Sequence, residues 1–318
     1  MDNDIAVIET QRLPSGLFVA GGGDYHKIWI RDNAYVALAF IEVGRYEEAA
    51  KVFSGLCKII KRYEAVLDQK GYPKGDAHIL HPRFTTAGAI VPGAWSNKQH
   101  DAVGILLYGM AQILHHDENL LGETERTIAQ KLVHYLERCQ YWQDEDDGMW
   151  EEIPALHSSS LAACIRGIEA MGDYCSYDVI GLSRAKANLE RQLPKESQAQ
   201  PVDMALLSLF WPYGYKRRDI VEEIEKKLLR SRGVIRHLGD LYEATGPEEP
   251  EWVMGIPWLG IAHFELGNHA KARAYLAATE KLYTHHNLPE AYLKNSHAVH
   301  TPLAWCHALT VVLRTKLA

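Results

Sequence analysis

The chain has 318 residues, of which 47% are hydrophobic and 24% charged, and a formal net charge of −7, a composition ordinary for a globular protein. The acidic balance argues against a nucleic-acid partner, because phosphate binding needs a basic surface and the longest basic run is residues 216–218. No apolar run approaches the roughly 20 residues of a membrane span. The acidic start without a signal peptide, and five cysteines without a CxxC pair, predict a cytoplasmic protein with reduced thiols.

Two kinds of helical segment are expected to alternate along the chain. The first kind is apolar almost all round, which is typical of helices buried on every side; these segments are 34–43, 102–111, 161–171, 204–210, 253–266 and 302–313. The second kind has one apolar stripe at helical spacing; these segments are 5–10, 49–60, 128–136, 180–189, 220–229 and 270–283. This alternation predicts an all-α fold, an (α/α)6 toroid or barrel of six inner and six outer helices. No linker or low-complexity tract divides the chain, so we expect a single domain over residues 1–318.

The connections between these helices differ in length with direction. Links from a buried to an amphipathic helix are tight, as at Gly44-Arg45, whereas most links in the other direction are long: 70–98, 143–157, 231–251 and 284–297. Long loops in a compact domain are usually functional. In a toroid of antiparallel helices they would all emerge at one rim, where we expect the site.

Aromatic and charged residues gather in these loops and before the first inner helix. The candidate site residues are Tyr25, Trp29, Arg31, Asp32, Trp95, Asp101, Trp150, Glu151, Glu152, Arg236, Trp252 and Glu290. Indole faces stack on the apolar face of a pyranose, and charged groups pair with its vicinal hydroxyls. Hydrolysis of the acetal needs one protonated and one ionised carboxyl group. The combination predicts a site for a small-molecule oligosaccharide substrate.

Each of these features also has a plainer interpretation. Asp32 could simply favour a helix N-terminus, the acidic run 144–152 could be a solvated loop, and Glu290 could be loop surface. Trp258, on an apolar helix, is expected in the core. Sixteen histidines include no HExxH motif, and the adjacent pairs lack a nearby ligand set, so we expect no metal and no cofactor. The joint occurrence of the candidates before inner helices favours the sugar site.

Six segments resemble glycoside hydrolase family 15, the glucoamylase family, and the related phosphorylase kinase α and β regulatory subunits. Residues 8–18 resemble the opening helix and turn of the family, and the resemblance covers nearly the whole chain. The other matching segments are Tyr25-x-x-x-Trp29-x-Arg31-Asp32, residues 95–104, the run Gly148-Met149-Trp150-Glu151-Glu152, residues 236–252, and Pro289-Glu290 with residues 301–305.

The resemblance implies an exo-acting, inverting hydrolase that releases β-glucose from a non-reducing end. It implies that Glu151 is the general acid and Glu290 the general base, which in an inverting enzyme stand roughly 6.5–9.5 Å apart. It assigns the remaining residues to substrate binding: Arg31 and Asp32 grip the terminal glucose, Tyr25, Trp95 and Trp252 shape the pocket, and Glu152 and Arg236 bind hydroxyls. A flanking Trp150 would raise the pKa of Glu151 by desolvation.

The chain also departs from the family pattern. Ala291 follows the base where many members have Gln, Gly148 stands where fungal members have an acidic residue, and residues 246–250 lengthen the third substrate loop. No starch-binding module or N-terminal β-sandwich is recognised. We therefore expect a short substrate such as maltose, isomaltose or a maltodextrin. Two alternatives stay open: a non-catalytic sugar-sensing barrel, which would have no need of Glu290, and an α,α-trehalase that uses the same machinery.

Overall fold

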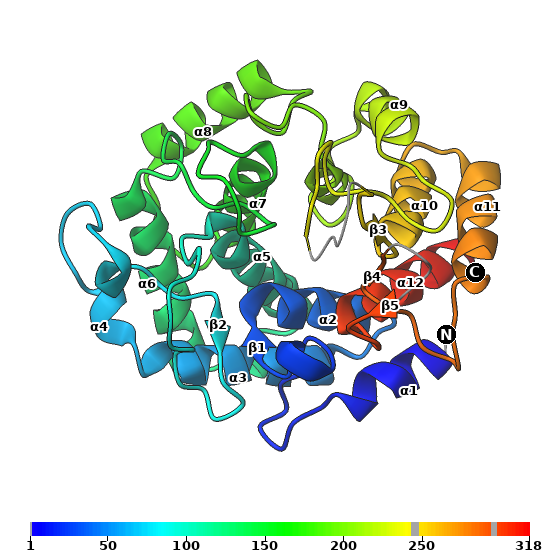
Figure 1. Ribbon diagram of the computed structural model, residues 1–318. Helices are drawn as coiled ribbons and strands as arrows, with labels where there is room; N and C mark the ends of the chain where they lie inside the picture. Colours follow the sequence, from blue (N-terminus) through cyan, green and yellow to red (C-terminus); the bar gives the residue numbers. More distant parts are fainter. Residues whose placement is uncertain (1, 243–247, 294–297) are drawn as a thin grey trace. The chain divides into compact units, whose positions relative to one another are not determined.

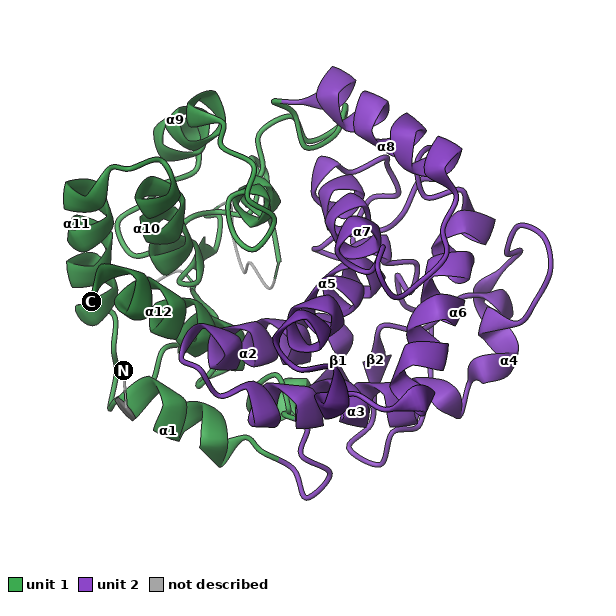
Figure 2. Cartoon of the chain, turned by 180° about the vertical axis from the view of Figure 1, so that it is seen from behind, with its two compact units in different colours: residues 1–12, 18–26, 194–318 green, residues 13–17, 27–193 purple. Residues whose placement is uncertain are grey.

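The computed structural model describes residues 2–242, 248–293 and 298–318 of the chain. It is mainly helical and falls into two compact units (Figure 2), each described here by itself. Unit 1 comprises residues 1–12, 18–26 and 194–318, and unit 2 comprises residues 13–17 and 27–193. Across the described ranges, no helix combines the length and the apolar character that a bilayer crossing requires.

Unit 2 contains three buried helices and three that cover them. The buried helices are α2 (Ile30–Glu42), α5 (His100–His116) and α7 (Ser158–Ala170), and α5 packs against both others. Helices α3 (Tyr46–Lys61), α6 (Glu123–Cys139) and α8 (Val179–Gln192) bury one face each. Short helices lie in the connections: α4 (Glu64–Leu67), which is labelled in Figure 1, η2 (Asp76–His78) and η3 (Glu118–Leu120). The predicted alternation is confirmed in this unit.

Helices α5 and α7 approach backbone to backbone. A Cβ atom on Gly104 of α5 would lie 2.4 Å from the carbonyl carbon of Ala163 on α7. Only glycine permits this distance, because any side chain would overlap the neighbouring backbone. The close crossing places the N-terminal ends of the two helices, and the loops before them, next to each other.

Unit 1 is built around α10 (Gly255–Glu265), which is buried over most of its length and packs on α11 (His269–Glu280) and α12 (Ala304–Leu317). Helix α1 (Asp2–Thr10) packs on α12, and α9 (Arg218–Lys227) contacts α10. The predicted core position of Trp258 is confirmed, since the side chain is fully buried and meets Trp305 edge to face at 5.6 Å.

The prediction of an inner helix over residues 204–210 is wrong in type. The segment is buried, as expected, but forms the six-residue 3-10 helix η4 (Met204–Leu209). The side chain of Asp203 accepts a hydrogen bond from the backbone N–H of Ala205 and starts the helix. Pro212 follows closely, and it disfavours α conformation in the residue before it and lacks an N–H donor. The apolar pattern therefore identified a buried segment but not its type of helix.

Small antiparallel sheets, absent from the prediction, hold the long loops just before inner helices. In unit 2, β1 (Ile28–Trp29) pairs with β2 (Arg83–Phe84), so that Trp29 lies opposite Arg83. In unit 1, β4 (Ala291–Tyr292) pairs with both β3 (Glu251–Trp252) and β5 (Ala298–Val299). Strand β1 runs directly into α2, and β3 ends shortly before α10. These sheets fix the residues that the sequence marks as candidates.

Candidate active site

Glu151 lies in a tight turn of unit 2 that three hydrogen-bond donors surround. Its Oε1 accepts from the indole Nε1 of Trp29 at 3.2 Å and from Nε2 of Gln99 at 2.9 Å, and its Oε2 accepts from Nε1 of Trp95 at 2.9 Å. The backbone of Glu151 has φ +62°, in the left-handed region. A residue other than glycine pays conformational energy there, and such strain clusters at functional sites.

The turn before Glu151 depends on a glycine at position 148. Gly148 has φ +66°, and a Cβ atom added to it would lie 2.7 Å from Nε2 of His157. A side chain at this position would be strained and would overlap the imidazole. The local path of this chain therefore requires glycine at position 148.

The environment of Glu151 favours the protonated carboxyl group. Its side chain is 14% exposed. Burial raises the pKa of Glu151, and the charge of Arg31 with the hydrogen bonds from Gln99 and Trp95 offsets this only in part. A carboxyl group with a raised pKa can carry a proton at a pH where an exposed glutamate has lost it. The predicted contribution of Trp150, which is half-buried, stays a prediction.

Arg31, in the first turn of α2, is held by a fork of hydrogen bonds. Its Nε and Nη2 donate to the two carboxylate oxygens of Asp101 at 2.6 and 3.0 Å, and Nη2 also donates to Oε1 of Gln99 at 2.8 Å. Its Nη1 lies 4.0 Å from Oε1 of Glu151. Burial opposes the charge of Arg31, but Asp101 outweighs it and raises the pKa of the guanidinium. Asp101 thus positions Arg31, while its own contact with a substrate stays a prediction.

Asp32 is another buried carboxyl group of unit 2, 8% exposed and in the first turn of α2. Burial raises the pKa of Asp32, Arg31 lowers it and the charge of Glu151 raises it, and together these effects place it at about 7. Near neutral pH this group can both donate and accept a hydrogen bond. That property suits a sugar hydroxyl, which also does both. Asp32 also lies in the first turn of α2, where a carboxylate stabilises a helix N-terminus.

Trp95 connects Glu151 to a residue that the sequence did not mark. The guanidinium of Arg83 lies 3.6 Å from the centroid of the Trp95 ring, a cation–π contact. Trp95 is 45% exposed. Its indole therefore has its N–H fixed on Glu151 and one face covered by Arg83, with much of the remaining surface open to a ligand.

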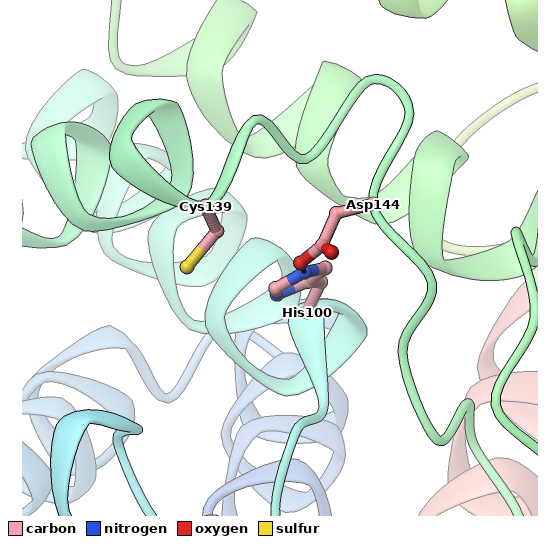
Figure 3. A group of neighbouring side chains, drawn as sticks. All are labelled: His100, Cys139 and Asp144. Atoms are coloured by element: carbon pink, nitrogen blue, oxygen red, sulfur yellow. Dashed lines mark hydrogen bonds and ion pairs between the residues drawn. The ribbon is translucent and has the colours of Figure 1, made fainter. Parts of the chain in front are cut away.

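In unit 2, three side chains of the types that bind metal ions lie together: His100, Cys139 and Asp144 (Figure 3). The ligand atoms lie within 4.8 Å of one another. However, Asp144 already accepts from Nε2 of His100 at 2.8 Å and from Nζ of Lys98 at 2.7 Å. Burial raises the pKa of the Cys139 thiol to about 12, which disfavours the thiolate that binds metals. The Lys98 ammonium supplies the positive charge that a metal ion would otherwise bring to Asp144. The cluster is therefore a hydrogen-bonded support for the start of α5.

In unit 1, Arg236 is the centre of an aromatic and acidic cluster. Its Nε and Nη2 donate to Asp240 at 2.9 and 2.7 Å, and its guanidinium lies 4.5 Å from the Trp252 ring centroid and 5.1 Å from that of Tyr242. The indole Nε1 of Trp252 also donates to Asp240, at 2.8 Å. Burial opposes the charge of Asp240, but Arg236 keeps its pKa lowered. Asp240 therefore fixes the two predicted residues Arg236 and Trp252 relative to each other.

Glu290 directly precedes β4, the central strand of the three-stranded sheet, and is 3% exposed. Its N–H donates to the Val299 carbonyl at 3.1 Å, and its carbonyl accepts from the N–H of Val253 at 2.9 Å. The hydroxyl of Tyr25 hydrogen-bonds the Glu290 carboxylate and also lies 2.8 Å from the hydroxyl of Tyr242. Burial and the Glu290 charge raise the pKa of Tyr25, so Tyr25 keeps its proton for this contact.

The chain before Glu290 is fastened to α12. The N–H of Leu288 donates to Nε2 of His307 at 3.0 Å, and the thiol of Cys306 donates to the Pro289 carbonyl at 3.4 Å. On its other side, Nδ1 of His307 lies 2.9 Å from Oδ1 of Asp4 on α1. These contacts fix the backbone that carries Glu290, which is what precise placement of a reacting carboxylate requires.

The predicted residues thus fall into two groups. Those in unit 2 are Trp29, Arg31, Asp32, Trp95, Asp101, Trp150, Glu151 and Glu152, and those in unit 1 are Tyr25, Arg236, Trp252 and Glu290. Glu152 is half-buried, and its N–H binds the Asp147 carbonyl; its contact with a substrate stays a prediction. Five residues that contact the candidates had no role predicted from the sequence: Arg83, Gln99, Asp240, Tyr242 and His300. Three of them, Gln99, Asp240 and Tyr242, lie within the quoted motifs, whereas Arg83 and His300 have no local signal.

The sequence and the fold are similar to those of known glycosidases. The family model of the glycosyl hydrolases family 15 matches residues 5–201. A glutamate-to-alanine variant of a glycosidase in complex with glucose is 20% identical, with a TM-score of 0.83 and coverage of 99% of this chain and 95% of that chain. No curated protein sequence matches significantly.

Two glucoamylases have a similar fold at lower identity. The glucoamylase from Saccharomycopsis fibuligera is 14% identical with a TM-score of 0.73, covering 99% of this chain and 93% of that chain. A bacterial glucoamylase complexed with acarbose is 14% identical with a TM-score of 0.72, covering 99% and 54%. At these identities the likeness concerns the fold, and it confirms the predicted glucoamylase-like (α/α)6 architecture.

Proposed function

Because the chain belongs to the glycosyl hydrolases family 15, we propose that it removes glucose from the non-reducing ends of short α-gluco-oligosaccharides, with inversion. The substrate class is maltose, isomaltose or a maltodextrin. The complexes of similar proteins with glucose and with acarbose support a sugar ligand. The observation that carries the proposal is the Glu151 carboxyl group, nearly buried among indole and amide donors with its pKa raised.

We assign Glu151 as the general acid. It must give a proton to the oxygen of the leaving group, and burial keeps that proton on the carboxyl group. Trp29, Trp95 and Gln99 then stabilise the carboxylate that forms when the proton leaves, since all three donate to it. Donors that stabilise the charge as it develops lower the barrier.

We assign Glu290 as the general base, which takes a proton from the attacking water. The role requires an ionised carboxylate, and the Tyr25 hydroxyl that hydrogen-bonds Glu290 favours that form. Its fixed backbone supports the assignment, because a base must hold the water in line with the anomeric carbon.

The other candidates bind the sugar in this proposal. Arg31 and Asp32 carry paired hydrogen-bonding groups for the terminal glucose, and the open surface of Trp95 offers an apolar face for a pyranose. Arg236 and Trp252 form the corresponding polar and aromatic pair of unit 1. We propose that residues 1–318 act as a single catalytic domain.

The assignment is tested by Glu151→Gln and Glu290→Gln. Each should lower kcat at least about 100-fold, the usual contribution of general acid or base catalysis, while unfolding temperature and glucose binding are retained. Glu145→Gln is the matched control, since Glu145 is exposed in the same loop as Glu151, and it should hydrolyse normally. Full activity in either of the first two variants would remove that residue from the mechanism.

The substrate class is tested with α-1,4, α-1,6 and α-1,3 oligosaccharides and α,α-trehalose, scored for glucose release. Linkage preference depends on contacts beyond the first sugar. Glucose from the α-1,4 or α-1,6 series supports the proposal, and turnover of trehalose alone would replace it by the trehalase alternative.

A further inference from the structure

His300 lies beside the Glu290 carboxylate, although no sequence motif marks it. Its Nε2 is 3.9 Å from Oε2 of Glu290, and the two side chains are 13% and 4% exposed. This distance is too long for a hydrogen bond. A protonated imidazole at this distance acts on the carboxylate through its charge, and because both side chains are largely buried such an interaction is weakly screened.

The backbone at His300 is strained in a way that aims the imidazole at Glu290. His300 has φ +44°, a left-handed conformation that costs free energy for a residue with a Cβ atom. It directly follows Val299, whose carbonyl binds the N–H of Glu290. The chain thus leaves β5 by a sharp turn immediately after the residue that fixes the Glu290 backbone.

Tyr25 links His300 and Glu290 from a third segment. Its ring packs on the His300 imidazole with centroids 4.1 Å apart and an interplanar angle of 34°, while its hydroxyl hydrogen-bonds Glu290. Tyr242 adds a second phenol through its contact with the Tyr25 hydroxyl. Phenols are neutral near neutral pH, so among these groups His300 is the one that can carry a positive charge. Ala291, which follows Glu290 in the chain, has no polar side chain that could contact the carboxylate.

We propose that His300 is a positioning residue for hydrolysis, which keeps the Glu290 carboxylate ionised and in place to accept a proton from water. The proposal rests on the assignment of Glu290 as the general base. An opposite charge within about 4–6 Å favours the ionised form of a carboxyl group. The Tyr25 ring holds the imidazole in this position, and Glu290 alone exchanges the proton with the nucleophilic water.

The test compares His300→Gln and His300→Phe with the wild-type enzyme. The first keeps a polar side chain without charge, and the second keeps the aromatic contact with Tyr25. Both should lower kcat about tenfold with little change in KM, and both should move the acidic limb of the kcat/KM profile to higher pH by about one unit. His115→Gln is the matched control, because His115 lies 3.8 Å from Asp173 in an exposed pair of unit 2, and its profile should match that of the wild type.

The outcomes separate this proposal from the proposed function. If the wild-type enzyme releases glucose and Glu290→Gln does not, the function stands. An unchanged acidic limb in both His300 variants would then overturn the role of His300, even if kcat falls, because a merely structural role does not shift the limb. A wild-type enzyme that hydrolyses no α-glucoside would instead overturn the proposed function itself.

Discussion

Replacing Trp95 by Phe removes one donor from Glu151 and leaves the aromatic ring in place. The indole Nε1 of Trp95 lies 2.9 Å from Oε2 of Glu151, and Arg83 packs on the ring at 3.6 Å. This hydrogen bond lowers the pKa of Glu151, so its loss should raise that pKa. The proposed acid then keeps its proton to higher pH, and the basic limb of the kcat/KM profile moves upward.

The size of the shift follows from the strength of the bond. A hydrogen bond to a charged group contributes about 1.5–3 kcal/mol, and the 45% exposure of Trp95 places this one at or slightly below the lower end. At 1.36 kcal/mol per pKa unit, a bond of about 1.4 kcal/mol predicts a shift of about one unit.

The assay is the pH dependence of kcat/KM, which reports the ionisation of the free enzyme, on a short α-glucoside. Trp142→Phe is the control, since Trp142 packs on Tyr141 and is not one of the three donors to Glu151; its basic limb should not move. A basic limb that stays in place or moves downward in Trp95→Phe would refute the reasoning about Glu151.

Two further predictions concern unit 1. Arg236→Lys keeps the charge but loses the fork to Asp240 and the planar contact with Trp252; kcat/KM should fall about 100-fold in steady-state kinetics, and a fall below about threefold would contradict a substrate role. For Asp4, burial opposes ionisation, yet His307, Tyr283 and Arg314 lower the pKa below 3.8 in the folded protein. Its stabilisation is therefore present above pH 4 and lost as pH falls through the lower folded pKa. Asp4→Asn should reduce the unfolding free energy at pH 7 by about 3 kcal/mol and flatten its acid dependence in urea titrations; equal stability of the two proteins at pH 7 would contradict this.

Hydrophobic periodicity was sufficient to predict most helices of the chain. The all-round apolar patterns that became α2, α5, α7, α10 and α12 reflect burial on every side, which the sequence records directly. The pattern failed at residues 204–210, because apolar content reports burial and does not distinguish a 3-10 helix from an α-helix.

The candidate residues could be predicted where a motif places them next to each other in the chain. Their partners could not, because the pairing depends on contacts distant in sequence. Arg83 reaches Trp95 only through the pairing of β1 with β2, two-residue strands below the reach of any periodicity. His300 lies beside Glu290 only because the chain makes a left-handed turn after β5. A histidine followed by a threonine does not predict that conformation.

The anomeric form of freshly released glucose tests most directly whether Glu151 and Glu290 act as the acid and base of an inverting hydrolase. An aryl α-glucoside releases a single glucose, so proton NMR in the first minutes, before mutarotation, identifies the primary product. The account predicts β-glucose first, because water attacks the face opposite the leaving group. α-Glucose as the first product would contradict it.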